Sequence, residues 1–242
     1  FDGDGIDEAL VTNRFGDVSV CRATDSKCET TDLGSIIGKD VTAADVDGDG
    51  VDEGVVLVTR GGKSELVVLN LYDLKDGEAR VVQLPAPVTL SRIAAGDLDK
   101  DGRSEIVGLE GDGYFSNTIH IFGYVNGGLS EFGTQTVATD VVDVSIGDMN
   151  GDDVPEVATL STSNSVELFV SQERGKLVSS YKAGLSETRA GTRIAMFDAD
   201  GDSPSGKLVR EAELVPGNIV PMAVMLHPPY SKTRSDGAAS VG

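Results

Sequence analysis

The chain has 242 residues, of which 40 are Asp or Glu and 20 are Lys or Arg, so its formal net charge is -20 at pH 7. A chain of this charge repels nucleic-acid phosphates and anionic membranes, which argues against both as direct partners. No apolar run approaches the roughly 18 residues of a membrane-spanning helix. We therefore expect no nucleic-acid partner and no direct membrane insertion by this segment.

The apolar runs favour an all-β fold. They are short and rich in Val and Leu, as in EGVVLV (53–58) and VELFV (166–170), while glycine is plentiful at 30 residues and tryptophan is absent. Short runs of this composition between turn residues are typical of strands. No stretch sustains the apolar period of a helix over three turns.

The chain begins within an acidic motif, DGDGIDE (2–8), and then reaches its two cysteines, Cys21 and Cys28. Six residues separate them, a spacing that suits a bridge across a hairpin or a short loop in an oxidising compartment. Two free thiols are the alternative, whereas a zinc site is disfavoured because no further Cys or His accompanies the pair. We expect a disulfide.

From residue 41 the chain repeats one pattern. Strands are predicted at 41–45, 53–58, 65–72 and 79–84, with an acidic loop after the first, and the same order follows twice more. The acidic motifs begin at Asp45, Asp97, Asp148 and Asp198, which lie 50 to 52 residues apart. Repeats of about 50 residues with four short strands predict an all-β β-propeller of four-stranded antiparallel blades. A helical solenoid is the less favoured architecture.

The predicted organisation is a propeller over residues 1–226 and a linker-like tail that leads to a further domain. About five blades are represented, which leaves the number of blades in the closed ring open. The predicted units are a partial blade at 1–40, blades at 41–90, 91–140 and 141–190, an atypical last blade at 191–226, and the tail at 227–242.

The acidic motifs have the ligand pattern of a calcium loop. Oxygen ligands at positions 1, 3 and 5, a turn residue at 6, a backbone carbonyl at 7 and a carboxylate at 9 suit a hard cation, and suit calcium better than magnesium. Solvated acidic turns are the alternative. The fifth loop is in doubt, because Gly206 stands where its last carboxylate belongs. The predicted ligands are Asp2, Asp4, Ile6 and Glu8; Asp45, Asp47, Asp49, Val51 and Glu53; Asp97, Asp99, Asp101, Arg103 and Glu105; Asp148, Asn150, Asp152, Val154 and Glu156; and Asp198, Asp200 and Asp202.

The segments TAADVDGDGVDE (42–53), AAGDLDKDGRSE (94–105) and SIGDMNGDDVPE (145–156) resemble the FG-GAP or VCBS-type repeats of integrin α-subunit propellers and of many secreted bacterial proteins. The resemblance covers the chain to about residue 206. AAG and SIG replace the literal Gly-Ala-Pro element, which favours the bacterial-type variant. The resemblance implies structural calcium, a secreted or cell-surface location, and a role in adhesion, in ligand binding or in supporting an attached domain.

Catalysis is the less favoured interpretation. The near-neutral bases are His120, between two isoleucines of a predicted strand, and His227, before two prolines of the tail. No nucleophile elbow, phosphate loop or zinc motif is present in the sequence. The paired carboxylates of a polysaccharide lyase or hydrolase stay open in so acidic a chain.

Three functions are compatible with these sequence features. The chain is a binding or adhesion module for a protein or glycan on a propeller face, a scaffold or targeting domain of a larger secreted toxin or surface protein, or the propeller of a polysaccharide lyase or hydrolase. The fold alone does not choose between them.

Overall fold

The computed structural model describes residues 8–15, 17–22, 27–33, 37–70, 80–82, 84, 88–111, 116–149, 152, 154–184, 193–197 and 207–211. These residues form strands and contain no helix, so the all-β prediction is confirmed for them and the helical solenoid is wrong. Consistent with this, the described part of the chain has no helix that is long and apolar enough to cross a membrane.

The strands in chain order are β1 (Glu8–Thr12), β2 (Asp17–Arg22), β3 (Lys27–Asp32), β4 (Ile37–Ala44), β5 (Glu53–Arg60), β6 (Lys63–Asn70), β7 (Arg80–Val82), β8 (Leu90–Gly96), β9 (Glu105–Glu110), β10 (Ser116–Val125), β11 (Gly128–Gly147), β12 (Glu156–Ser161), β13 (Ser165–Glu173), β14 (Lys176–Gly184), β15 (Arg193–Phe197) and β16 (Lys207–Glu211).

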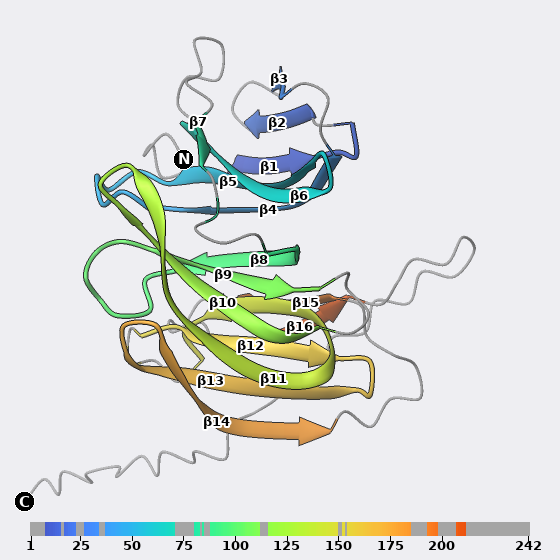
Figure 1. The fold of residues 1–242 in the computed structure, drawn as a ribbon, viewed down its shortest axis with the longest axis vertical. Helices are drawn as coiled ribbons and strands as arrows, with labels where there is room; N and C mark the ends of the chain where they lie inside the picture. Colours follow the sequence, from blue (N-terminus) through green and yellow to red (C-terminus); the bar gives the residue numbers. More distant parts are fainter. Residues whose placement is uncertain are drawn as a thin grey trace, which may run out of the picture.

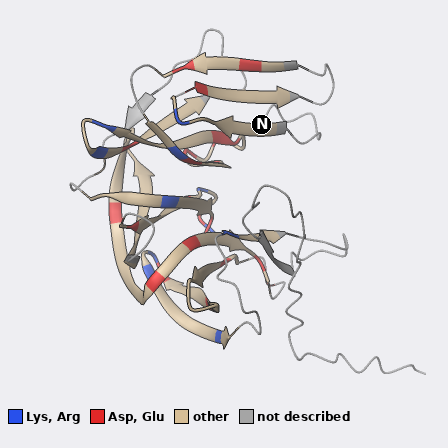
Figure 2. Cartoon of the chain, turned by 90° about the vertical axis from the view of Figure 1, so that its right-hand side faces the viewer, with Lys and Arg blue, Asp and Glu red and all other residues tan. Residues whose placement is uncertain are grey.

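The strands pair in chain order, and every pairing is antiparallel. β1 to β3 form one sheet, β4 to β7 a second, β8 to β14 a third, and β15 and β16 a fourth. The first three sheets follow one another along the length of the molecule in the order of the chain, and the fourth lies beside the third (Figure 1). Acidic residues occur throughout this arrangement and are not confined to one segment (Figure 2).

The third sheet is continuous because β11 belongs to two ladders. Its first part pairs with β10, from Gly128 opposite Val125 to Thr136 opposite Thr118. Its last part pairs with β12, from Val141 to Gly147. The sequence predicts separate strands here, near 132–138 and from 142. The structure joins them in one strand of 20 residues, which curves through the molecule in Figure 1.

The apolar core lies between neighbouring sheets, and β5 shows why its sequence is almost entirely apolar. Val56 and Val58 pack toward Val18 and Val20 of β2. The alternate residues of β5, Val55 and Leu57, belong to another cluster with residues of β8, β9 and β10. Since successive side chains of a strand point to opposite faces, both faces of this sheet are buried. Two further clusters continue the stacking from β9 to β15.

Each repeat has a first strand, which is β4, β8, the last part of β11 or β15, and these first strands lie side by side. β4 contacts β8, β8 contacts the last part of β11, and β11 contacts β15. The chain leaves β4, β8 and β11 through the acidic segments 45–53, 97–105 and 148–156. Because these three strands are neighbours, the three acidic loops emerge at neighbouring places.

The predicted disulfide is confirmed. Cys21 of β2 and Cys28 of β3 occupy directly opposed register positions and are bonded through their sulfurs. The bridge fixes the hairpin that carries Val18 and Val20 into the core.

Candidate metal centre

The acidic loops share one set of hydrogen bonds between carboxylates and backbone amides. We number each loop from its first Asp, so that Asp45 is position 1 and Glu53 is position 9. Glu at position 9 accepts a bond from the amide at position 2 in all three loops, at 3.1, 2.9 and 2.8 Å. The bonded pairs are Glu53 with Val46, Glu105 with Leu98, and Glu156 with Met149.

The aspartate at position 5 makes the second recurring bond. Its Oδ1 accepts from the amide at position 7, at 2.9 Å in Asp49–Val51, 3.0 Å in Asp101–Arg103 and 2.8 Å in Asp152–Val154. In the first two of these loops, position 1 also accepts bonds from the amides at positions 5 and 6. The loops therefore fold inward around their own aspartates, and they do so in the same way.

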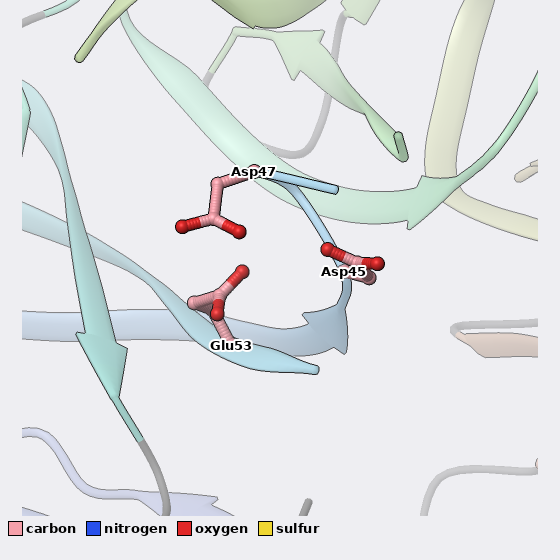
Figure 3. A group of neighbouring side chains, drawn as sticks. All are labelled: Asp45, Asp47 and Glu53. Atoms are coloured by element: carbon pink, nitrogen blue, oxygen red, sulfur yellow. The ribbon is translucent and has the colours of Figure 1, made fainter. Parts of the chain in front are cut away.

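Loop 45–53 gathers three carboxylates. Asp45, Asp47 and Glu53 each offer an oxygen, and these oxygens lie within 4.8 Å of one another. Figure 3 shows the carboxylates of Asp47 and Glu53 facing each other, with Asp45 beside them. Asp49 is not part of this group; its Oδ1 accepts the amide of Val51.

Loop 97–105 gathers Asp97, Asp99 and Asp101 within the same limit of 4.8 Å. Glu105, predicted as the closing ligand, is not part of the group; its side chain is buried and accepts the amide of Leu98. Lys100, at position 4, has a φ of 60°, the left-handed conformation that Gly48 adopts at the same position of the earlier loop with a φ of 84°. Sequence reasoning placed no constraint on this position.

The remaining predicted ligands are only partly described. Loop 148–156 contributes Asp148, Asp152 and Glu156, but no group of three carboxylates is found among the described residues of this loop. The predicted backbone ligands Val51, Arg103 and Val154 all lie at the expected turn position. Asp2, Asp4, Ile6, Asn150, Asp198, Asp200 and Asp202 lie outside the described residues, as does the side chain of Glu8.

The glutamates at position 9 are held in an environment that opposes their ionisation. Burial, and then the neighbouring aspartates, raise the pKa of Glu53 to about 7, and the same causes raise the pKa of Glu105 to about 7. Burial also raises the pKa of Glu156. A divalent cation would favour the ionised form of these groups. The donors are all oxygens, which fit calcium, and Asp45, Asp47 and Glu53 or Asp97, Asp99 and Asp101 would hold it.

The loops also contact one another. The amide of Ser104 donates to the carbonyl of Asp45 at 2.7 Å, which joins loop 97–105 to loop 45–53. On the other side, Lys100 Nζ donates to the carbonyl of Asp152 at 2.7 Å. The loops thus form one connected acidic region, which we call the acidic loop cluster (45–53, 97–105, and the described residues of 148–156). Repeat spacing alone did not predict these contacts.

His120 behaves as the strand residue that the sequence predicts. It lies on β10, where its Nδ1 is 2.8 Å from Glu131 Oε1 and its Nε2 is 3.3 Å from Glu110 Oε2. Both ring nitrogens are therefore engaged with carboxylates of the neighbouring strands β9 and β11. His227 lies outside the described residues.

Comparison with known proteins identifies the fold and not the family. No family model matches the chain, and no curated protein matches it. Two crystal structures of BBS1N in complex with ARL6DN are similar, one soaked with lead and one with mercury. The first has a TM-score of 0.57 at 14% identity, and the second 0.55 at 16%. Each match covers 84% of this chain and only 58% or 57% of the BBS1N chain. BBS1N is a β-propeller, so the all-β fold described here is that of a β-propeller.

Proposed function

We propose that the chain is a calcium-stabilised β-propeller of the FG-GAP or VCBS type, which acts as a binding, adhesion or scaffold module of a larger secreted or cell-surface protein. The observation that carries this proposal is one pair of carboxylate–amide hydrogen bonds, from positions 2 to 9 and 7 to 5, that recurs at three successive strand connections. In two of these loops three carboxylates also lie within 4.8 Å of one another, a grouping that a bound cation would stabilise.

The sheet organisation supports the assignment of four-stranded blades. β4 to β7 form a four-stranded sheet, and the two halves of β11 complete one set of four with β8 to β10 and another with β12 to β14. Of the following unit, the structure describes the antiparallel pair of β15 and β16. The sheet of β4 to β7 and the two four-stranded units that share β11 bury both faces against their neighbours, so their outer rims and ends are the surfaces left for a partner.

A protein or a glycan is the proposed partner. The similar structures are complexes of a propeller with a protein, which supports protein binding in general. The disulfide between Cys21 and Cys28 supports an oxidising, extracellular location. Calcium would be available there at about 1 mM, which suits the dissociation constants of roughly 0.1 to 1 mM typical of extracellular modules.

Calcium should stabilise the fold measurably. At about 1 mM free calcium, mass action gives about 0.4 to 1.4 kcal/mol for each site with such a dissociation constant. Loops 45–53 and 97–105 together would then add about 1 to 3 kcal/mol, which raises the melting temperature by several degrees in a domain of this size. Calorimetric melting curves in calcium, in magnesium and in chelator test this. We expect the highest melting temperature in calcium.

Asp47→Asn and Asp52→Asn form a matched pair for the same experiment. Both residues are exposed in one loop, but Asp47 belongs to the group of three carboxylates and Asp52 does not. Asp47→Asn should reduce the calcium-dependent rise in melting temperature, and Asp52→Asn should leave it close to that of the wild type. Identical melting curves of the wild type in calcium and in chelator would contradict the proposal.

A further inference from the structure

Loop 97–105 differs from loop 45–53 in one respect: an arginine already contacts its carboxylates. Arg174 lies in the turn between β13 and β14. Its Nε is 3.2 Å from Asp99 Oδ2, and its Nη2 is 2.8 Å from Asp101 Oδ2. Both aspartates belong to the group of three carboxylates in this loop.

Loop 45–53 has no such partner within the part of the chain that the structure describes. Its aspartates bond to backbone amides of the loop, and no Lys or Arg among the described residues forms an ion pair with Asp45, Asp47 or Glu53. The two loops therefore have the same fold and different electrostatic surroundings. Loop 97–105 has a guanidinium paired with two of its grouped carboxylates, whereas Arg103, whose side chain lies against Gly48 of loop 45–53, forms no ion pair with Asp45, Asp47 or Glu53.

The guanidinium of Arg174 is held in place from its other side. Its Cζ lies 4.1 Å from the centroid of the Phe132 ring, a cation–π contact. The ring in turn lies against Gly123, where a Cβ would collide with it. Arg174 is thus sandwiched between an aromatic ring on β11 and two carboxylates of the acidic loop cluster.

We propose that Arg174 is the resident cation of loop 97–105 and competes with calcium for Asp99 and Asp101, so that loop 45–53 is the tighter calcium site. This inference rests on the proposed function. Oδ1 of Asp99 and Oδ1 of Asp101 already accept backbone amides, so a metal would have to share the Oδ2 atoms that Arg174 contacts, and the positive guanidinium repels a cation there. The arginine also keeps the loop charge-compensated when calcium is scarce.

The contacts predict that calcium displaces Arg174 from the aspartates, and not that Arg174 excludes calcium from loop 97–105. Arg174 and Asp101 are partly exposed, with 46% and 37% of their side chains accessible, and exposed ion pairs contribute little free energy. Two such pairs would weaken calcium binding at this loop by about threefold to tenfold. The two loops should therefore fill in sequence as calcium rises, with loop 45–53 first.

Calorimetric calcium titrations of the 242-residue chain test the competition. Arg174→Met removes the charge and keeps an apolar contact with Phe132, so we expect calcium binding to tighten by about threefold to tenfold at one site. Lys100→Met is the matched control. It removes one positive charge from the same loop, but its Nζ bonds to the carbonyl of Asp152 and not to the three aspartates. Its effect should be smaller.

An Asp99→Asn background locates the effect. Arg174→Met should not change calcium binding once Asp99 has lost its charge, because the contested site is then disabled. A second readout is thermal stability: Arg174→Met should melt below the wild type in chelator, and the difference should shrink at saturating calcium. If Arg174→Met does not fold, Arg174→Lys replaces it, and it should tighten calcium binding less because lysine keeps the charge but loses the planar fork.

The possible failures are distinct. Equal effects of Arg174→Met and Lys100→Met, or a full effect of Arg174→Met in the Asp99→Asn background, would show only a long-range charge effect and overturn the competition. Calcium binding that Arg174→Met leaves unchanged would also overturn it, while the proposed function stands. If neither the wild type nor Arg174→Met binds calcium, the proposed function itself fails.

Discussion

Four charged residues occupy the same position in successive repeats, five residues before the first Asp of each acidic motif. They are Asp40, Arg92, Asp143 and Arg193, and their charges alternate along the chain. Arg193 Nη1 lies 3.5 Å from Asp40 Oδ1 and 3.7 Å from Asp143 Oδ1. Arg92 Nε lies 3.5 Å from Asp143 Oδ1. The four side chains come from β4, β8, β11 and β15, so this cluster joins four repeats through their first strands.

The two aspartates also fix the register between neighbouring sheets. Asp40 Oδ2 accepts the amide of Ile93 at 2.9 Å, and Asp143 Oδ2 accepts the amide of Ile194 at 2.7 Å. Each aspartate lies on the first strand of one repeat and accepts a backbone amide from the first strand of the following repeat. This amide is one residue beyond the position that is equivalent to the aspartate. Removing either carboxylate would leave a buried amide without its partner.

Asp143 should make stability depend on pH. Burial raises its pKa to about 6, although the amide of Ile194 and the two arginines act in the opposite direction. Because folding raises this pKa, the carboxyl contributes most to stability below about pH 4, and this contribution is lost as the pH rises through about 6. The free energy of unfolding of the wild type, relative to Asp143→Asn, should therefore fall by about 2 to 3 kcal/mol between pH 4 and pH 7.

Urea unfolding of both proteins in chelator measures this difference. The carboxylates of the acidic loops titrate in both proteins, so they cancel in the comparison. A difference in unfolding free energy that stays constant from pH 4 to pH 7 would contradict the prediction, since it would mean that folding leaves the ionisation of Asp143 unchanged.

At the scale of elements, the hairpin of β10 and β11 comes unusually close to the turn between β13 and β14. A Cβ at Gly133 of β11 would overlap the carbonyl oxygen of Gly175, and Gly175 itself has a φ of 75°. This approach brings Phe132 under Arg174. The glycines of the two hairpins are therefore required by packing between elements and not only by their own turns.

Gly133→Ala should destabilise the protein by about 1 to 3 kcal/mol, because the methyl group has no space and the backbone of the turn must move. Gly128→Ala is the matched control on the same strand, since a Cβ there meets nothing within 4 Å. It should change the free energy of unfolding by less than about 0.5 kcal/mol. Denaturant midpoints of the two variants provide the measurement, and equal shifts would refute the steric explanation.

The sequence predicted the strands better than it predicted the site. The predicted strands 53–58 and 65–72 correspond closely to β5 and β6, because an apolar run between turn residues is a local signal. The sequence also predicted strands on both sides of residue 140, but it did not predict that they join in the single strand β11. The loop conformation followed from the spacing of its aspartates, whereas the grouping of particular carboxylates did not.

The parts that could not be predicted depend on contacts across repeats. Arg174 and Asp101 are 73 residues apart in the sequence and meet only because neighbouring repeats of the curved third sheet stack. Nothing in the local sequence ERGK (173–176) distinguishes this arginine from any exposed one. The two groups of carboxylates also differ in their third member, which is Glu53 at position 9 in the first loop and Asp101 at position 5 in the second. This difference depends likewise on how deeply the glutamate at position 9 is buried.

At the scale of the whole molecule, stability should follow the stacking of the sheets. β5 supplies residues to two core clusters, one on each face. β2 is also a central strand, hydrogen-bonded on both edges, but its buried residues Val18 and Val20 belong to one cluster, while Ser19 on its other face bonds to Thr30 at an exposed position. The two strands thus have equal backbone pairing and unequal side-chain burial.

Hydrogen exchange should separate these two strands. The amides of β5 should exchange only through opening of much of the protein, and those of β2 at least about ten times faster through local opening of the first sheet, because fewer apolar contacts must be broken. The disulfide joins β2 to β3 and does not involve β5. Replacing both cysteines by serine should therefore increase the exchange of the β2 and β3 amides and leave that of the β5 amides nearly unchanged. Mass spectrometry of deuterated peptides resolves the three strands. Exchange in β2 as slow as in β5 would mean that backbone pairing, and not burial between sheets, sets the stability of each repeat.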